Sequence, residues 1–295
     1  MNDIIISVRD LCKCFGDFVA VDHITFDVKR GEIFGFLGAN GAGKTTAMRM
    51  LCGLSYPTSG RGMVAGYDVM TQGEEIKKHI GYMSQKFSLY DDLTVRENIR
   101  LYAGIYGLGR YQMLRRTVEM LNRLHFRSEI DTLVGSLPLG WKQKLAFSIA
   151  TLHRPEVVFL DELPWMDTAG SNFISALEHF WNGWASARRD IVLIVCGSAT
   201  SWMMDKLINN HGGLYGRLTH RLFLQPFSLG ESEAFLKTKG MMLSRYELAE
   251  LYMILGGIPY YLNLFDERLS LAQNIDRLLF NPNGQLYNEF TILYR

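Results

Sequence analysis

The sequence has few cysteines and no long hydrophobic segment. Its four cysteines are Cys12, Cys14, Cys52 and Cys196, and the pair Cys12 and Cys14 has no second pair with which to complete a zinc site. We therefore expect reduced thiols, as in cytoplasmic proteins. No apolar run approaches the roughly 20 residues that span a bilayer. Any role at a membrane would then require a separate partner chain.

The sequence also lacks a strong excess of charge of either sign. Its net charge of +1 gives no broad electrostatic attraction for nucleic acid or anionic lipid. The start, Met1-Asn2-Asp3, leads directly into the apolar segment 4–6, so we expect no signal peptide. With 295 residues, of which 48% are hydrophobic, the chain can hold one large α/β domain or two smaller ones.

A phosphate-binding loop is the most informative motif. Residues 38–45, GANGAGKT, match the pattern G-x-x-x-x-G-K-[ST] at every fixed position. Segment 33–37 reads as a buried strand before the loop, and segment 46–52 as a helix after it. Lys44 would reach the phosphates of a nucleoside triphosphate, and the Thr45 hydroxyl would contact Mg²⁺. The predicted nucleotide-binding residues of this segment are Gly38, Ala39, Asn40, Gly41, Ala42, Gly43, Lys44, Thr45 and Thr46.

An acidic pair follows a second apolar segment, residues 157–160, which we interpret as a central strand. Asp161 would hold Mg²⁺ through water, and Glu162 would polarise the attacking water as general base. Lys44 and Glu162 are therefore the candidate catalytic residues. The long separation between the loop and this pair predicts an insert, at about 94–150. We expect it to be helical because Thr94 to Glu97 forms a capping-box pattern that opens a helix toward Tyr106.

With these motifs in this order, residues 1–162 resemble the nucleotide-binding subunit of ABC transporters, particularly those serving ABC-2 type exporters. The resemblance implies an α/β P-loop NTPase fold with a mostly parallel sheet, an antiparallel N-terminal β subdomain and a helical insert. It implies that Phe15 stacks on adenine and that Gln85 contacts Mg²⁺ and the attacking water. The alternatives are a core aromatic for Phe15 and a solvated loop amide for Gln85.

The same resemblance implies Mg²⁺-dependent hydrolysis of ATP in the cytoplasm. It implies a membrane permease as partner, through which the chain would lie peripherally on the inner face of the cell membrane. It also implies an ATP-dependent homodimer. No nucleic acid is expected as a partner.

Three segments depart from the ABC pattern. Leu137-Pro138-Leu139-Gly140-Trp141 stands where the family usually carries Leu-Ser-Gly-Gly-Gln, so the serine that would bind the partner's γ-phosphate is absent. Gly140 and a helix opening near Trp141 would still offer backbone N–H groups; the alternative is a plain helix-start turn. Asp167 is out of register, and the strand at 191–195 ends in Cys196-Gly197-Ser198 where a switch histidine is expected.

Residues 158–295 resemble a different family, the prokaryotic AAA-type ATPases of the archaeal-ATPase group. The likeness rests on segments 161–165 (DELPW), 196–198 (CGS), 216–221 (GRLTHR) and 256–261 (GGIPYY). It implies that Ser198 is a polar sensor near the γ-phosphate and that Arg217 or Arg221 responds to the nucleotide. It also implies a helical C-terminal lid, in agreement with capping-box patterns at 228–231 and 244–247.

The two resemblances together predict a hybrid chain. Its parts would be an ABC-type domain at 1–162, an AAA-type continuation at 158–225 and a truncated, lid-like helical region at 226–295. A recombined, an engineered and a misjoined chain would each give this sequence. Three functions fit it: the ATPase subunit of an exporter, a AAA-type switch ATPase without transport, and an ATP-binding protein with poor turnover.

Overall fold

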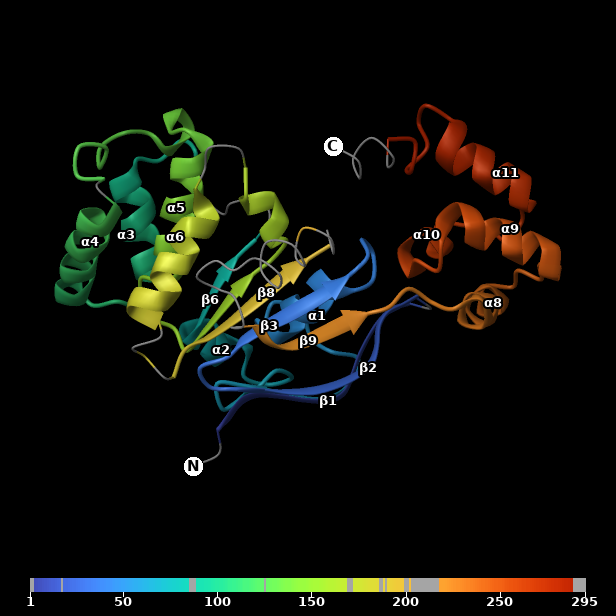
Figure 1. Ribbon diagram of the computed structural model, residues 1–295, viewed down its shortest axis with the longest axis horizontal. Coiled ribbons are helices and arrows are strands. Elements are labelled where there is room, and N and C mark those ends of the chain that lie inside the picture. The colour runs from blue at the N-terminus through green and yellow to red at the C-terminus, as the bar shows by residue number, and fades with distance from the viewer. Residues whose placement is uncertain are drawn as a thin grey trace. The chain divides into compact units, whose positions relative to one another are not determined.

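The chain forms two compact units, shown in the computed structural model of Figure 1. Unit 1 comprises Met1–Lys13, Val21–Gly38 and Lys44–Phe223, and unit 2 comprises Cys14–Ala20, Ala39–Gly43 and Leu224–Arg295. Among the described residues, no helix is long and apolar enough to cross a membrane. The structure describes residues 3–16, 18–84, 89–124, 126–168, 172–185, 188, 190–198, 202 and 218–288.

The N-terminal part of the chain builds a four-stranded sheet in the order β2-β1-β4-β5. Its strands are β1 (Ile4–Phe15), β2 (Phe18–Lys29), β4 (Ser59–Val64) and β5 (Tyr67–Asp68). β4 runs antiparallel to both β1 and β5, with Ile6 opposite Val64. The predicted antiparallel β subdomain is therefore confirmed.

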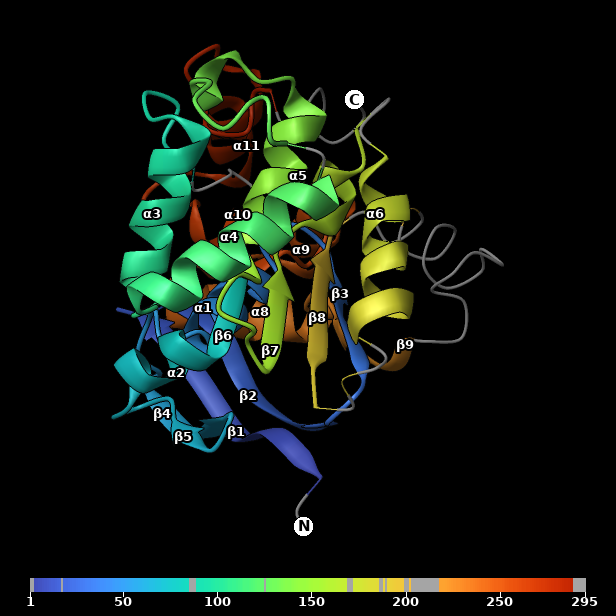
Figure 2. The same cartoon turned by 90° about the vertical axis from the view of Figure 1, so that its left-hand side faces the viewer.

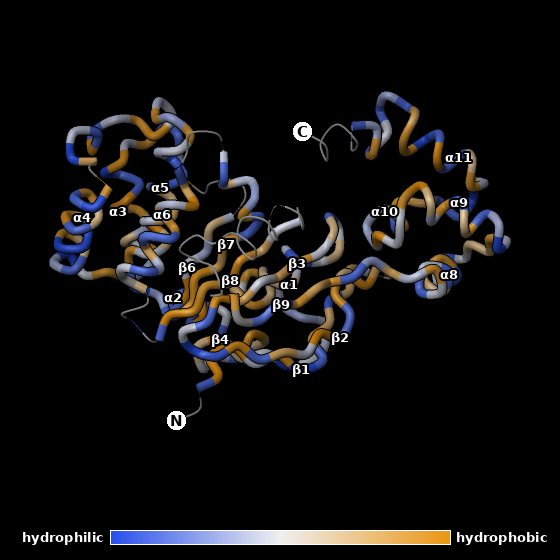
Figure 3. The backbone as a smooth tube through the Cα atoms, viewed as in Figure 1, coloured by the Kyte–Doolittle hydropathy of each residue, from blue (hydrophilic) through white to orange (hydrophobic). Residues whose placement is uncertain are grey.

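A second sheet has five strands in the order β6-β7-β8-β3-β9. The strands are β3 (Ile33–Gly38), β6 (Ile80–Met83), β7 (Val157–Leu160), β8 (Val192–Gly197) and β9 (Leu218–Leu224). The pairs β6·β7, β7·β8 and β8·β3 are parallel, as Figure 2 shows. Every residue of β3, β7 and β8 is buried. Such continuous hydrophobic strands, orange in Figure 3, are typical of parallel sheets covered on both faces.

The register of the parallel strands brings their carboxyl ends to one edge of the sheet. Leu37 of β3 lies opposite Gly197 of β8, and Leu160 of β7 lies opposite both Val195 and Met83. The segments that follow β3, β7 and β8 are therefore neighbours, although they are far apart in the sequence. This edge carries the candidate site, as is usual for open parallel sheets.

Helices α3 (Val95–Ile105), α4 (Arg110–Leu124) and α5 (Leu139–Ala150) lie within residues 94–150, the range predicted as a helical insert, and α6 (Phe173–Phe180) follows β7. The helix α5 belongs to two hydrophobic cores of unit 1. Its Phe147 packs with the sheet and α6, while its Leu145 and Ile149 pack with α3 and α4. In the described part of unit 1 the chain also forms α1 (Lys44–Leu51) and α2 (Gly73–His79).

Unit 2 has a hydrophobic core of its own, which includes Leu236, Leu251, Leu262 and Phe265. The patterns beginning at Ser228 and Ser244 are true capping boxes, as the sequence predicts, and Ser270 begins a further one. The α-helices described in this unit are α8 (Leu229–Thr238), α9 (Arg245–Leu255), α10 (Pro259–Asn263) and α11 (Leu271–Ile275).

Candidate nucleotide-binding site

The phosphate loop connects β3 to α1. Gly38, Gly41 and Gly43 all have positive φ, at 150°, 77° and 87°. These are values that residues with a side chain rarely adopt, so the glycines of the motif allow this path of the chain. α1 begins at Lys44, two residues earlier than the sequence suggests.

Lys44 is held at the edge of the sheet. Its side chain is 3% exposed, and its Nζ donates a hydrogen bond to the Gly38 carbonyl at 2.9 Å. The same Nζ lies 3.6 Å from Glu162 Oε1. A buried ammonium beside one carboxylate is a fixed positive charge, which suits the binding of phosphate oxygens.

Asp161 directly follows β7 and contacts two hydroxyl groups. Thr45 Oγ1 lies 3.2 Å from its Oδ1, and the Tyr82 hydroxyl donates to its Oδ2 at 3.1 Å. Burial raises the pKa of the Asp161 carboxyl, while the hydrogen bond from Tyr82 opposes that rise. Burial also raises the pKa of the Tyr82 phenol, so Tyr82 remains a neutral donor.

Glu162 follows with an unusual backbone. Its φ is +58°, in the left-handed region that side-chain-bearing residues seldom occupy outside functional sites. Its Oε2 accepts hydrogen bonds from Ser198 N at 3.1 Å and from Ser198 Oγ at 2.9 Å. The side chain is thus fixed between Lys44 and Ser198, at the position where β7 and β8 end.

The donor set fits a magnesium ion. The Thr45 hydroxyl and the Asp161 carboxylate already lie side by side, and hard oxygen donors of this kind are the ligands that Mg²⁺ prefers. Thr45 directly follows Lys44 in the chain, so an ion bound by the Thr45 hydroxyl would lie near the phosphates that Lys44 binds. Asp161 is buried without a basic side chain as its hydrogen-bond partner in the described contacts, so a cation would compensate its charge.

Two contributors to the site are absent from the sequence prediction, Tyr82 and Cys196. Both surround Asp161, Tyr82 through the hydrogen bond above and Cys196 as a buried neighbour of the acidic pair. The burial of Cys196 raises the pKa of its thiol. Tyr82 lies on β6 and Cys196 on β8, the two strands on either side of β7. Their place in the site therefore follows from the order of the strands and from no short sequence pattern.

Several predicted site residues lie elsewhere or outside the described part. Gln85 and Arg217 lie outside the described residues. Phe15 ends β1 and is 55% exposed; its contact with adenine stays a prediction. Arg221 is exposed on β9. Thr46 lies in the first turn of α1.

The signature-like segment forms the start of α5, which begins at Leu139 rather than near Trp141. The Trp141 N–H donates to the Pro138 carbonyl at 2.9 Å, and the offer of other backbone N–H groups at this helix start to a phosphate stays a prediction. Leu137 is buried in the core of the insert. Gly140, in the first turn, remains the candidate for contact with a phosphate.

The comparisons with known proteins agree with this geometry. Residues 21–164 match the family model described as "ABC transporter". Over 180 residues, 61% of this chain and 30% of the relative, the sequence is 44% identical to a probable multidrug ABC transporter ATP-binding protein, YbhF, of Escherichia coli. Over 158 residues, 54% of this chain and 51% of the relative, it is 42% identical to the bacitracin transport ATP-binding protein BcrA of Bacillus licheniformis.

Solved structures share the fold. An ATP-binding subunit of an ABC transporter aligns with a TM-score of 0.63 at 23% identity, covering 83% of this chain and 98% of that one. The ADP conformation of another ATP-binding cassette aligns with a TM-score of 0.57 at 20% identity, covering 69% and 84%. The predicted fold class is confirmed.

The chain spans only 30% and 51% of the lengths of these two relatives, and the family model ends at residue 164. The resemblance of the second half to AAA-type ATPases therefore stays a prediction. The predicted class of domain, a P-loop ATPase that uses ATP with Mg²⁺, is confirmed. Residues 21–164 thus match the ABC transporter family model and lie within a chain of P-loop NTPase fold.

Proposed function

We propose that the chain is the ATP-hydrolysing subunit of an ABC-type export system. The observation that carries this proposal is the meeting of Lys44 and Thr45 with Asp161 and Glu162 at one edge of the sheet. The relatives named as multidrug and bacitracin transport ATP-binding proteins support a role in transport. The partner would be a membrane permease, which would hold the chain at the cytoplasmic face of the membrane.

The chemistry follows from the positions of these side chains. Lys44 and the loop N–H groups would bind the β- and γ-phosphates, and Thr45 and Asp161 would hold Mg²⁺, which neutralises phosphate charge. Glu162 would orient the attacking water and accept its proton. Lys44 and Ser198 contact that carboxylate and fix its direction.

The test is ATP hydrolysis by the purified full-length chain with Mg²⁺. Glu162→Gln keeps the shape of the side chain but removes the base, so turnover should fall by roughly 10²- to 10⁴-fold while ATP binding persists. Lys44→Ala should remove ATP binding itself. Glu74→Gln is the matched control, because Glu74 is an exposed partner of Lys77 on α2, and it should leave both properties unchanged.

A weak ATPase is the competing function, and one contact favours it. Glu162 Oε2 already accepts two hydrogen bonds from Ser198, so this oxygen has less capacity left to accept a hydrogen bond from the attacking water. In that case Glu162→Gln would hardly change an already low rate. The same assay therefore separates the two functions.

Dimer formation tests whether the chain acts as a transporter subunit. We propose an ATP-dependent head-to-tail dimer in which Gly140, at the start of α5, faces the nucleotide of the partner. Gly140→Trp should then abolish turnover and leave ATP binding intact. Glu162→Gln with ATP should elute as a dimer in size-exclusion chromatography and as a monomer without ATP. An unchanged rate in Gly140→Trp would contradict the proposed arrangement.

A AAA-type switch remains our second candidate for the region after residue 158, with 226–295 as its lid. The contact between Ser198 and Glu162 supports it, since Ser198 is the polar residue assigned there to nucleotide sensing. The separate helical core of unit 2 agrees with a lid. Arg221→Ala should then alter hydrolysis and the nucleotide-dependent protection of unit 2 from protease; if both stay unchanged, this candidate is rejected.

A further inference from the structure

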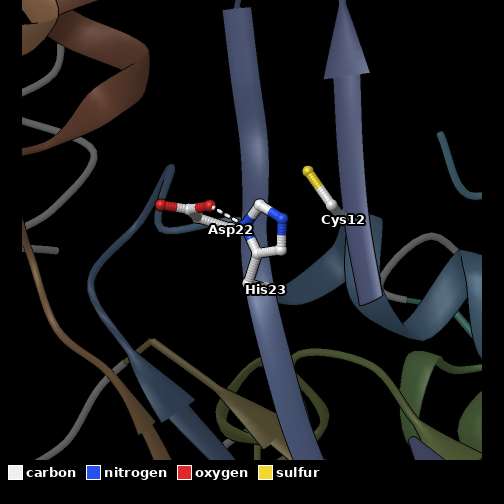
Figure 4. A group of neighbouring side chains, drawn as sticks. All are labelled: Cys12, Asp22 and His23. Carbon is white, nitrogen blue, oxygen red and sulfur yellow. Dashed lines mark hydrogen bonds and ion pairs between the residues drawn. The ribbon is translucent and has the colours of Figure 1, made fainter. Parts of the chain in front are cut away.

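A second group of chemically reactive side chains lies on the antiparallel sheet, formed by residues that the nucleotide site does not use. Cys12 belongs to β1, and Asp22 and His23 belong to the neighbouring strand β2. One donor atom from each residue lies within 4.8 Å of the other two. Figure 4 shows the His23 imidazole between the Asp22 carboxylate and the Cys12 sulfur.

An irregular backbone brings these three groups together. Consecutive side chains of a regular strand point to opposite faces, yet His23 Nδ1 and Asp22 Oδ1 are 2.5 Å apart. His23 has a φ of +41°, in the left-handed region that breaks the alternation. On the other strand, the register of β1 with β4 shifts between Arg9 and Cys12. Both strands thus depart from regular geometry beside the cluster.

We propose that Cys12, Asp22 and His23 bind a Zn²⁺ ion. A thiolate, an imidazole nitrogen and a carboxylate oxygen are the three donor types that proteins use for zinc. Zinc holds such donors tetrahedrally at about 2.0–2.3 Å, so two donors that share one ion lie roughly 3.3–3.8 Å apart. The present atoms all lie within 4.8 Å of one another, so only a small movement would bring them to that spacing, and water would complete the coordination.

The burial of the three side chains differs in a way that suits metal uptake. Cys12 is 4% exposed and provides a fixed sulfur, whereas His23 and Asp22 are 63% and 69% exposed. Their mutual hydrogen bond has to open for both to bind the ion, and exposed side chains can rotate without disturbing the strand. On binding, the Cys12 thiol releases its proton to solvent as the zinc–sulfur bond forms, and no electron is transferred.

The experiment is a Co²⁺ titration of the reduced, tag-free, full-length protein, followed by thiolate-to-cobalt charge-transfer absorption. We expect a band that saturates at about one equivalent per chain and that added Zn²⁺ displaces. Cys12→Ser should abolish the band. His23→Ala and Asp22→Asn should each weaken binding by roughly 10- to 100-fold or more, since removal of even an outer-shell partner costs that much.

The matched control is Cys14→Ser, two residues along the same strand and outside the cluster, which should keep the band. His23→Ala changes an exposed side chain, so it remains informative if Cys12→Ser fails to fold. Absence of the band in the wild-type protein, or a band of full strength in His23→Ala, overturns the proposal. Lys44→Ala should lose ATP binding and keep cobalt binding, so this proposal and the proposed ATPase function fail independently.

Discussion

Ser198 fixes the carboxylate of Glu162 with two hydrogen bonds, one from its backbone N–H and one from its hydroxyl. The residues are 36 positions apart in the chain. They meet because β8 inserts between β7 and the phosphate-loop strand β3. A residue at the end of β8 therefore lies beside both the acidic pair and the loop. This position is where the ABC pattern expects a histidine.

The first prediction concerns this contact. Ser198→Ala removes the hydroxyl and retains the N–H, so Glu162 keeps one of its two hydrogen bonds. A hydrogen bond to a charged group contributes about 1.5 kcal/mol or more, and about 1.4 kcal/mol corresponds to a tenfold change in rate. We therefore expect kcat for ATP to fall about tenfold with little change in KM, measured by steady-state phosphate release.

Ser198→Thr is the matched control, because it keeps the hydroxyl, and it should retain most of the activity. A rate that rises in Ser198→Ala would mean that the Ser198 hydroxyl competes with the attacking water for the Glu162 carboxylate. That outcome would favour the reading of the chain as a weak ATPase.

Local sequence patterns predict much of this site because each depends on a short segment. The loop from Gly38 to Thr45, the acidic pair and the capping boxes all involve neighbours within a few residues. The contact of Tyr82 with Asp161 depends on which strands are adjacent, and no short pattern encodes that order. The positive φ of Glu162 depends on the sharp turn after β7. The approach of His23 to Cys12 depends on the pairing of two strands.

The motif Gly256-Gly257-Ile258-Pro259 has a structural explanation in addition to the resemblance that drew attention to it. Gly256 ends α9 with a φ of 61°, and Pro259 begins α10. A Cβ on Gly257 would lie 1.8 Å from the Phe227 carbonyl oxygen, and the Phe227 N–H donates to the Gly257 carbonyl at 2.7 Å. The two backbones are in direct contact, so this position requires glycine.

The second prediction follows from that contact. Gly257→Ala should destabilise unit 2 by about 3 kcal/mol, because the backbone of Phe227 has to move, as in overpacked cores. Gly256→Ala should cost only about 1 kcal/mol, since its positive φ is strained for alanine but its surroundings are open. The measurement is thermal unfolding followed by circular dichroism.

Gly230→Ala serves as the control for this series. Gly230 lies in the first turn of α8 with open space where its Cβ would be, so alanine should be neutral or slightly stabilising there. Equal losses in Gly256→Ala and Gly257→Ala would show that backbone conformation, and not close packing, decides the requirement for glycine.

The third prediction concerns acid stability and His153, in the turn after α5. The pKa of His153 is lowered from 6.5 to about 4, chiefly by burial; the hydrogen bond to Ile80 opposes this shift, and the charges of Arg116 and His79 add smaller lowering contributions. Its Nε2 lies 2.9 Å from the Ile80 carbonyl. Its Nδ1 is buried without a hydrogen-bond partner, and its ring stacks on Tyr106 at 3.9 Å. The folded protein therefore contains the neutral imidazole.

The direction of the pH effect follows from proton binding. Between pH 6.5 and about 4 the unfolded chain binds a proton at His153 that the folded chain does not, so the free energy of unfolding decreases as the pH falls through this range. The full stability is present above pH 6.5, and the loss by pH 4 is at most about 3 kcal/mol, at 1.36 kcal/mol per pKa unit.

His153→Gln removes the titrating group. It should reduce the difference between urea unfolding free energies measured at about pH 7.5 and about pH 5. His220→Gln, at an exposed histidine beside Glu32, should leave that difference nearly unchanged; an equal effect of the two substitutions would show that burial of His153 is not the cause.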